Sequence, residues 1–299
     1  MMKLIGKTNI DFIGKRYISI SFSILLILIT IVSLIIHKGP NLGIDFTGGI
    51  LVQIKFKQLP KLLELRNILS EGGINNPELK TFPGINSVII QIKTKQEESE
   101  QITTKIKDIF LKKNIEFNVE RVEFVGPKIG KYLSNRAILS ILLSFLGIII
   151  YVALRFKSSI WGVSGVIALI HDVFITMGLL SILNREITLN VIAALLTLAG
   201  YSINDTIVIF DRIRENLTLQ RKEPLDKILN ISINQTLSRT IITSLTVELV
   251  LLVLFLLGGE VIHDFALSLL FGCFIGTYSS IFIASPIVYE WILFRTKRK

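Results

Sequence analysis

Six stretches of the chain are apolar over a length that suits a helix crossing a lipid bilayer. Such a helix needs about 20 apolar residues, within a range of about 17–25. The six stretches are residues 17–36, 136–154, 160–183, 187–210, 240–257 and 265–294. We expect the last and longest to bend or stop near Pro286, because proline removes a helical hydrogen bond. The pattern predicts a multi-pass α-helical membrane protein with six transmembrane helices.

The polar segment at residues 37–135, between the first two spans, alternates between strand and helix patterns. Alternating β-branched runs predict strands at 49–56, 78–82, 87–93 and 117–125, and helical spacing predicts helices at 62–70 and 97–113. Turns are predicted at Gly72-Gly73, Asn75-Asn76-Pro77 and Pro83-Gly84. The order βαββαβ is that of the ferredoxin-like unit, an α+β domain in which two helices cover one face of a four-stranded sheet.

Two turn-rich junctions join this domain to the first and second spans. The junction residues are Asp45, Gly48, Gly49, Gly126 and Pro127. A structural role is favoured, in which Asp45 makes an Asx-type turn, the glycines allow positive φ and Pro127 stiffens the chain. The alternative is that the junctions are hinges between the membrane helices and the polar domain, which small residues permit.

Composition agrees with a membrane protein, because 51% of the residues are hydrophobic and the mean hydropathy is +0.61. The net charge of +10 could suggest a nucleic-acid partner. However, the basic residues lie beside the spans and do not form one dense face, so they are expected to orient helices, and no nucleic acid is expected. The single cysteine, Cys273, allows no internal disulfide. No small-residue cleavage pattern follows the first span, so we expect a retained anchor.

The distribution of basic residues predicts the orientation of the spans. One set of flanks holds Lys3, Lys7, Lys15, Arg16, Arg155, Lys157, Arg212, Arg214, Arg221, Lys222, Lys227, Arg295, Lys297, Arg298 and Lys299. The opposite short loops hold only Arg185. Because basic flanks stay inside, we expect a cytoplasmic N-terminus at 1–16, a cytoplasmic loop or amphipathic segment at 211–239 and a basic cytoplasmic tail at 295–299. Residues 37–135 are then a periplasmic domain.

The fourth span carries a carboxylate, Asp205, and such a charge at the bilayer centre costs roughly 2.5–3.5 kcal/mol. Other polar residues recur at helical spacing in the same span, and these are Asn190, Thr197, Tyr201 and Asn204. Together they form a polar seam on one side of the helix. We expect the seam to face a partner helix or a water-filled cavity.

Arg239 lies at the cytoplasmic end of the fifth span, directly before residue 240, and we expect it at a depth similar to that of Asp205. An Asp–Arg pair between two antiparallel helices is the arrangement of these charges that costs least. The pair could be a structural staple. The alternative is proton coupling, because the proton affinity of a carboxylate depends on whether a guanidinium is near. A proton crossing the membrane potential supplies about 2.3 kcal/mol per 100 mV, enough to bias a two-state switch.

Three further groups of polar or small residues lie within the spans. His171 and Asp172 are either a polar pair hydrogen-bonded within the bundle or weaker candidates for proton coupling. Glu248 follows Arg239 by half a helical turn in angle, so we expect it to lie off the Asp205 seam and to be protonated or paired outside this chain. A ladder of small residues in the sixth span consists of Ser268, Gly272, Gly276 and Ser280. The ladder favours close helix packing, within the chain or against a second subunit.

The polar domain shows no metal-ligand spacing, nucleophile elbow or phosphate loop. No catalytic residue, metal or cofactor is therefore expected, and any chemistry should lie in the membrane with protons as the coupling ion.

Several runs of the sequence carry a family resemblance over nearly its whole length. They are residues 43–49, 125–130, 151–156, 169–172, 200–216 and 234–244. The densest reads Gly200-Tyr-Ser-Ile-Asn-Asp-Thr-Ile-Val-Ile-Phe-Asp-Arg-Ile-Arg-Glu-Asn216. With these motifs the chain resembles the SecD/SecF family of Sec translocase subunits, which is related to the resistance–nodulation–division transporters.

The resemblance implies a subunit of the bacterial inner membrane that works with SecD, usually with YajC, beside the SecYEG channel and downstream of the SecA ATPase. There it would use the proton-motive force to complete the export of unfolded preproteins. The residues tied to proton movement in the family fall on Asp205 and Arg239. Glu248 departs from the apolar residue expected at its position. The six helices would be half of a twelve-helix unit.

The sequence leaves three alternatives to a non-enzymatic, proton-driven translocase subunit. An intramembrane aspartyl protease would use Asp172 and Asp205 as its dyad, although the sequence before Asp205 is Ser-Ile-Asn and not the usual Gly-x-Gly. A proton-coupled small-molecule exporter usually carries much larger outer domains. A passive scaffold for translocon assembly would tolerate loss of Asp205.

Overall fold

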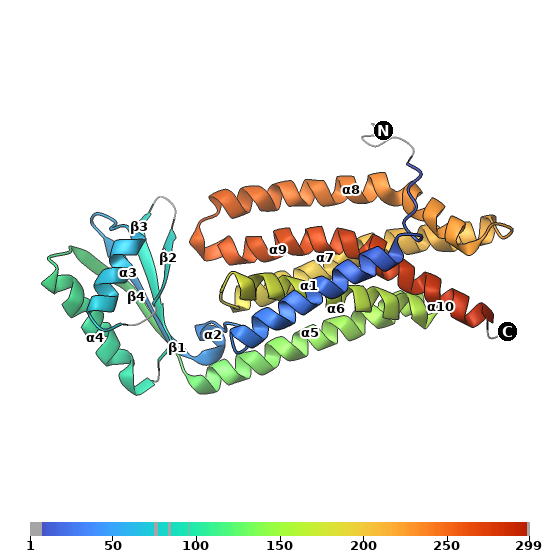
Figure 1. Cartoon of the computed structure of the whole chain (residues 1–299). Coiled ribbons are helices and arrows are strands. Elements are labelled where there is room, and N and C mark those ends of the chain that lie inside the picture. Colours follow the sequence, from blue (N-terminus) through green and yellow to red (C-terminus); the bar gives the residue numbers. More distant parts are fainter. Residues whose placement is uncertain (1–7, 75–76, 83–84, 95, 298–299) are drawn as a thin grey trace.

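The computed structural model describes residues 8–74, 77–82, 85–94 and 96–297, which form a small sheet domain at one end of a long helical bundle (Figure 1). The first and last described residues both lie at the opposite end of the bundle (Figure 1). The predicted turn residues Asn75, Asn76, Pro83 and Gly84 lie outside the described residues.

Six helices in the described residues are long and apolar enough to cross a membrane, as the hydrophobic pattern predicted. They are α1 (Arg16–Ile36), α5 (Pro127–Phe156), α6 (Ser159–Ile182), α7 (Leu189–Leu219), α8 (Leu225–Leu257) and a sixth that starts as α9 (Glu260–Ser279). The sixth continues through a π-helical turn, η1 (Ser280–Ala284), into α10 (Ser285–Lys297). This turn ends two residues before Pro286, so the irregularity expected there is a local widening of the helix.

Several helices extend well beyond their apolar spans. The segment predicted as a loop or amphipathic stretch at 211–239 is helical except for residues 220–224, because α7 and α8 run on past the apolar stretch. Ion pairs such as Arg212 with Glu215 at 2.6 Å stabilise the polar end of α7. Loss of hydrophobicity therefore marks the membrane boundary and not the end of the helix.

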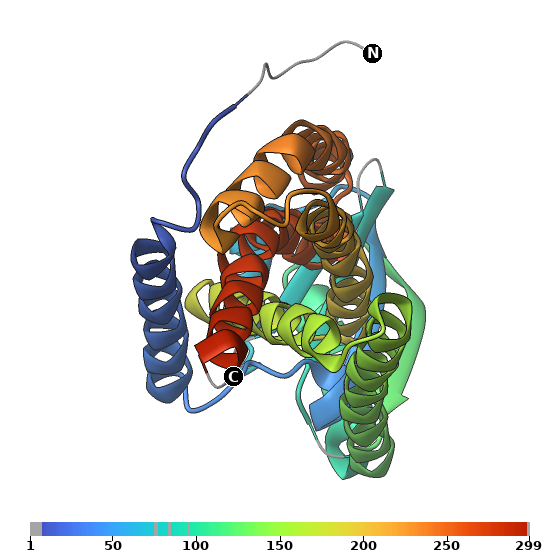
Figure 2. The same ribbon diagram turned by 90° about the vertical axis from the view of Figure 1, so that its right-hand side faces the viewer.

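The helices differ in how much of their surface the chain itself covers. Within its apolar window α6 is 67% buried, whereas α5 is only 6% buried. Figure 2 shows α1, α5 and α8 around the outside of the bundle. The apolar faces of these outer helices are suited to lipid or to a membrane partner.

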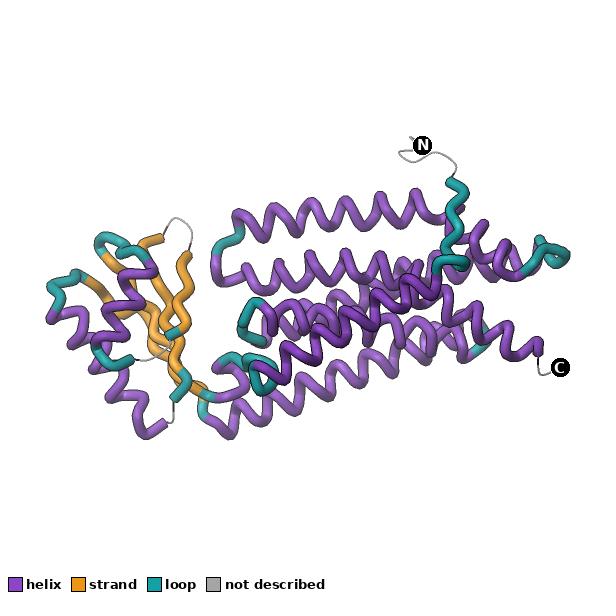
Figure 3. The backbone as a smooth tube through the Cα atoms, viewed as in Figure 1, coloured by secondary structure: helices purple, strands orange, loops and turns teal. Residues whose placement is uncertain are grey.

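The sheet domain has the predicted ferredoxin-like arrangement, shown with orange strands and purple helices in Figure 3. Its elements are β1 (Gly49–Phe56), α3 (Leu62–Glu71), β2 (Glu78–Phe82), β3 (Ile85–Ile92), α4 (Gln96–Lys112) and β4 (Phe117–Val125). The strands are antiparallel in the order β2-β3-β1-β4. Fully buried side chains of β1 pack against Leu65 of α3 and Phe110 of α4, which places both helices on one face.

The junction between sheet domain and bundle is built differently from the predicted Asx turn. A four-residue helix, α2 (Ile44–Thr47), contains Asp45, and Asp45 Oδ2 accepts a hydrogen bond of 2.9 Å from the backbone N–H of Leu189. Asp45 thus caps the distant helix α7 and does not close its own turn. Gly48 and Gly49 have the expected positive φ, at +81° and +155°. Gly126 precedes α5 and Pro127 begins it. Hinge motion at this junction stays a prediction.

Candidate functional site

Asp205 lies inside the bundle, where α7, α8 and α9 meet, and its residue is 3% exposed. Ser244 of α8 donates a hydrogen bond of 3.1 Å from Oγ to Asp205 Oδ2. The same Ser244 Oγ lies 2.7 Å from Thr277 Oγ1 of α9. A carboxylate and two hydroxyl groups therefore form a continuous chain across three helices.

Arg239 does not form an ion pair with Asp205 in this structure, although its charge acts on that carboxylate. Arg239 is exposed, whereas Ser244, five residues later on α8, is buried beside Asp205. Five residues correspond to about 140° around a helix, which directs the two side chains to different faces of α8. The predicted pair is thus open, and Arg239 lies about 7.5 Å from Ser244 along the axis of α8, towards the end of the bundle that holds the chain ends.

The predicted polar seam on α7 is divided between two environments. Asn190, Thr197 and Asn204 are exposed on the outer surface of the bundle, although Asn204 directly precedes the buried Asp205. Neighbouring residues point about 100° apart on a helix, which explains the division. The hydroxyl of Tyr201 is buried, makes no hydrogen bond of ordinary length within the described part of the chain, and lies close enough to Ser244 for that residue to act on it.

His171 and Asp172 form a second polar cluster, at the contact of α6, α7 and α9. Asp172 is fully buried and accepts hydrogen bonds of 2.7 Å from both Ser202 Oγ and Ser279 Oγ. Its other oxygen lies 3.0 Å from His171 Nδ1. This is the intrabundle pair that the sequence suggested, with two serines added that sequence reasoning did not select.

The small-residue ladder of the sixth helix faces α7 within the same chain. A Cβ atom on Gly272 would lie 2.5 Å from Leu198, and one on Gly276 would lie 2.9 Å from Ser202 Cβ. Ser268 and Ser280 are buried as well. The ladder brings α9 close enough to α7 for Ser279 and Ser202 to share Asp172.

Sequence reasoning also missed Ser244 and Thr277 as partners of the Asp205 site. Ser244 was noted only as part of a family motif, and Thr277 was not singled out. A usable signal exists, because hydroxyl residues facing a carboxylate across neighbouring helices supply hydrogen bonds that the apolar surroundings cannot.

A cleft of about 680 Å³ lies between the sheet domain and the bundle, with Arg66, Glu78, Lys93 and Glu186 among its lining residues. Lys93 Nζ lies 2.9 Å from Glu186 Oε1. Burial raises the pKa of the Glu78 carboxyl, and the negative charge of Glu186 raises this pKa further. Charged side chains of the sheet domain and of the bundle therefore face each other across this cleft.

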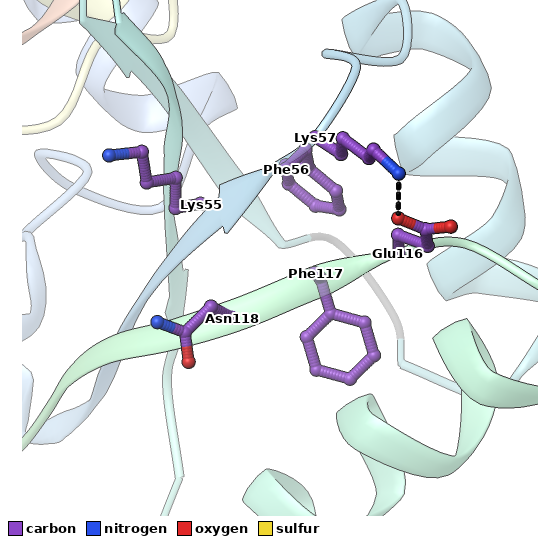
Figure 4. Close-up of a pocket in the computed structure, with 6 residues that line it drawn as sticks. All are labelled: Lys55, Phe56, Lys57, Glu116, Phe117 and Asn118. Carbon is purple, nitrogen blue, oxygen red and sulfur yellow. Dashed lines mark ion pairs between the residues drawn. The ribbon is translucent and has the colours of Figure 1, made fainter.

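A second, shallow pocket of about 300 Å³ lies on the sheet domain (Figure 4). Its lining residues are Lys55, Phe56, Lys57, Glu116, Phe117 and Asn118. Lys57 and Glu116 form an ion pair of 2.8 Å, and both side chains are largely exposed. Exposed pairs contribute only about 0–1 kcal/mol and organise no chemistry. Within the described residues, no three His, Cys, Asp or Glu side chains gather as metal ligands.

Comparison with known proteins agrees with the geometry. The model for the C-terminal part of the protein-export membrane proteins SecD/SecF matches residues 105–293, and the SecD/SecF GG motif matches residues 33–58, which include Gly48 and Gly49. Protein translocase subunit SecF of Endomicrobium trichonymphae is 45% identical over 299 residues, covering 99% of this chain and 96% of the relative. SecF of Thermodesulfovibrio yellowstonii is 44% identical, covering 96% of both chains.

A solved structure shows the same architecture. The crystal structure of SecDF from Thermus thermophilus, described as a translocon-associated membrane protein, matches with a TM-score of 0.83 and 37% identity. The match covers 98% of this chain but only 40% of the SecDF chain. From its sequence and its fold, the chain belongs to the SecD/SecF family of protein-export membrane proteins, among the SecF translocase subunits.

Proposed function

We propose that this subunit couples proton movement to late-stage export of unfolded preproteins, with Asp205 as the group that takes up and releases the proton. The observation that carries the proposal is the environment of Asp205, a buried carboxylate held by a hydroxyl group and not by a cation. Keeping a charge in such surroundings costs free energy, and a proton removes that cost. The two protonation states therefore favour different arrangements of the helices.

The hydroxyl groups beside Asp205 can serve both protonation states. When the carboxylate is charged, the Ser244 hydroxyl donates to it and accepts from Thr277. When the carboxyl is protonated, it can donate to Ser244, and Ser244 can then donate to Thr277. Hydroxyl groups rotate to suit either direction. The site can thus change protonation without leaving a buried donor unpaired.

Arg239 supports the proposal as a mobile countercharge. Its guanidinium acts on Asp205 from a distance in this conformation. The two side chains could therefore move together into an ion pair when Asp205 is charged. Protonation of Asp205 would release the arginine, and deprotonation would draw it back. The membrane potential supplies about 2.3 kcal/mol per 100 mV for each proton that crosses. This energy would shift the balance between the two arrangements.

The exposed polar face of α7 and α8 supports a membrane partner. Asn190, Asn204 and Arg239 are exposed on helices that are otherwise apolar enough to face lipid. Polar groups in such helices are expected to face other protein or water. The part of SecDF beyond the 40% matched by this chain makes a SecD-like subunit the natural occupant. YajC, the SecYEG channel and the SecA ATPase are the further partners proposed from the family resemblance.

We further propose that both chain ends lie in the cytoplasm and the sheet domain in the periplasm. The basic flanks of the spans gather at the end of the bundle that holds both chain ends (Figure 1). The rule that basic flanks stay inside supports this orientation. The sheet domain would then face preprotein emerging from the channel.

Substitution Asp205→Asn tests the proposal. In membrane vesicles energised by a proton gradient, we expect the gradient-dependent part of preprotein export to disappear, while the step driven by ATP and insertion of the subunit remain. Asp211→Asn is the matched control, because Asp211 lies six residues further along α7, in ion pairs with Arg155 and Arg214. Export that kept its full dependence on the gradient in Asp205→Asn would overturn the mechanism and would favour a passive scaffold.

The other two alternatives have distinct outcomes. An aspartyl protease needs two carboxyl groups that share a proton, whereas Asp172 accepts from Ser202 and Ser279, and Asp205 accepts from Ser244. Peptide cleavage by the purified subunit would support that alternative. Substrate-dependent proton release from vesicles that lack the channel would support a small-molecule exporter.

A further inference from the structure

Glu248 of α8 is a carboxylate within a membrane span. Its side of the helix differs from the one that we expected from the sequence. Measured from Arg239, it was expected to lie off the Asp205 site. The structure shows that Ser244, with Thr243 beside it, and not Arg239, brings α8 into contact with Asp205. Glu248 follows Ser244 by one helical turn, and residues four apart lie on the same helix face. Glu248 therefore shares the face of α8 that meets Asp205.

The contacts of Ser244 fix what lies opposite Glu248. Helices α7 and α9 run antiparallel to α8, and Ser244 lies level with Asp205 on one and with Thr277 on the other. One turn towards the sheet domain is four residues forward on α8 and four residues back on the other two helices. That step leads from Ser244 to Glu248, from Asp205 to Tyr201, and from Thr277 to Cys273.

Packing and electrostatics agree with this register. Tyr201 and Cys273 belong to one apolar cluster with Val247 and Leu251, the α8 residues on either side of Glu248. The negative charge of Glu248 acts on both Tyr201 and Cys273. These are the titratable groups that face Glu248 from α7 and α9, and Asp205 and Arg239 lie further towards the end of the bundle that holds the chain ends.

The hydroxyl of Tyr201 lies near both carboxyl groups in this arrangement. It is one turn from Asp205 on α7, and the charges of both Asp205 and Glu248 act on it. It is buried, it makes no hydrogen bond of ordinary length among the described residues, and Ser244, the donor to Asp205, is close enough to act on it. A phenol can accept one proton while donating its own. A buried hydroxyl at this place is suited to passing a proton between the carboxyl groups, directly or across one water.

Among the described residues, no partner explains the presence of Glu248. It is half-buried, and no ion pair or hydrogen bond to it occurs among the described residues. A carboxyl group in a span costs free energy unless it is paired, protonated or functional. Glu248 is also the more distant of the two carboxyl groups from the chain ends, and so the nearer to the sheet domain.

We propose that Glu248 is a second proton-carrying residue of this subunit, which receives a proton from the sheet-domain side and passes it through Tyr201 to Asp205. This inference rests on the proposed function of Asp205. One proton leaves the Glu248 carboxyl for the Tyr201 oxygen, and the Tyr201 hydroxyl proton goes to Asp205. Glu248 then takes its next proton from water on the sheet-domain side. No other bond changes.

The test measures gradient-driven export per inserted subunit in Glu248→Gln, Glu248→Leu and Tyr201→Phe. A positioned proton-transfer group contributes about 10²–10⁴-fold to a step, and we expect the initial rate to fall roughly tenfold or more in all three. Glu248→Asp should restore part of the rate. Glu260→Gln is the matched control, since Glu260 lies at the start of α9, outside the relay. In the wild type the rate should depend on the proton concentration of the sheet-domain side, and Glu248→Gln should weaken that dependence.

Three outcomes would decide the inference. If Asp205→Asn abolishes gradient dependence but both Glu248 variants keep the wild-type rate, the relay is wrong and the proposed function stands. If Asp205→Asn keeps gradient dependence, the proposed function itself fails. If the Glu248 variants lower the thermal midpoint of the detergent-solubilised protein while the rate per folded subunit is unchanged, the role of Glu248 is structural and the relay is overturned.

Discussion

The backbone N–H of Leu189 donates a hydrogen bond of 2.9 Å to Asp45 Oδ2, across 144 positions of the sequence. Asp45 belongs to the short helix between α1 and the sheet domain, and Leu189 begins α7, the helix that carries Asp205. A parallel bridge between Leu42 and Ile187 reinforces the contact. The junction of the sheet domain is therefore attached directly to the helix of the candidate proton site.

This contact predicts the effect of Asp45→Ala. The substitution removes an acceptor from the first turn of α7, and loss of such a cap costs about 0.5–2 kcal/mol. We expect a decrease of about 1 kcal/mol in the free energy of unfolding of the detergent-solubilised protein. Asp45→Asn keeps an acceptor oxygen and should lose less. Equal losses in the two variants would show that the charge, and not the cap, stabilises the junction.

A second prediction concerns Ser244, whose hydroxyl is the donor to Asp205. A hydrogen bond to a charged group contributes about 1.5–3 kcal/mol, so Ser244→Ala should disfavour the charged state of the site. We expect gradient-driven export to slow by about tenfold, with normal insertion of the subunit. Ser238→Ala, on the same helix but in no hydrogen bond with Asp205, should export at the wild-type rate. An undiminished rate in Ser244→Ala would exclude the hydroxyl chain from the mechanism.

Two helical glycines, Gly276 and Gly147, differ in the space around them. A Cβ on Gly276 would lie 2.9 Å from Ser202 Cβ and 3.6 Å from Asp172 Oδ2, whereas a Cβ on Gly147 would have nothing within 4 Å. Gly276→Ala should push α9 from α7 and lower the thermal midpoint, because overpacking costs typically about 1–3 kcal/mol. Gly147→Ala should be neutral or stabilising by up to about 1 kcal/mol. If both variants unfolded at the wild-type temperature, the ladder would not control the approach of the helices.

The parts of the fold that the sequence predicted are those set by local pattern. Strand β1 was predicted with its observed bounds, Gly49–Phe56, because alternation along a half-buried strand is written in consecutive residues. The six spans were found because a bilayer demands a minimum apolar length. Helix ends were missed where charged residues continue a helix into water, as at Arg212 and Glu215 in α7.

Only part of the candidate site could be predicted from the sequence. Asp205 stood out because a carboxylate is rare in an apolar span. The rise of a helix placed Arg239 near the same membrane boundary, but it did not show which α8 residue lies level with Asp205. The rotation of α8 about its own axis could not be read in this way. It is set by packing against α7 and α9, and it turns Ser244 inward and Arg239 outward. The same rotation brings Glu248 to the site.

The last prediction concerns pH and the contact between the sheet domain and the bundle. Glu78 lies on β2, which packs against the start of α9. Burial, followed by the negative charge of Glu186, raises its pKa above the ordinary value of 4.5, while Lys80 acts in the opposite direction. The folded protein therefore holds this proton at pH values where the unfolded chain has released it. Stability from Glu78 is fully present below pH 4.5 and is lost as the pH rises through the raised pKa.

Glu78→Gln removes this titration and keeps the shape of the side chain. We expect the thermal midpoint of the wild type, relative to Glu78→Gln, to fall as the pH is raised from about 4 to about 7. Glu64→Gln, in the first turn of α3, is the matched control on the sheet domain and should leave the pH profile of the wild type unchanged. A wild type that gained stability over Glu78→Gln with rising pH would require a cation to reach Glu78. In that case Lys80 or Arg185, and not repulsion from Glu186, would determine how the sheet domain docks on the bundle.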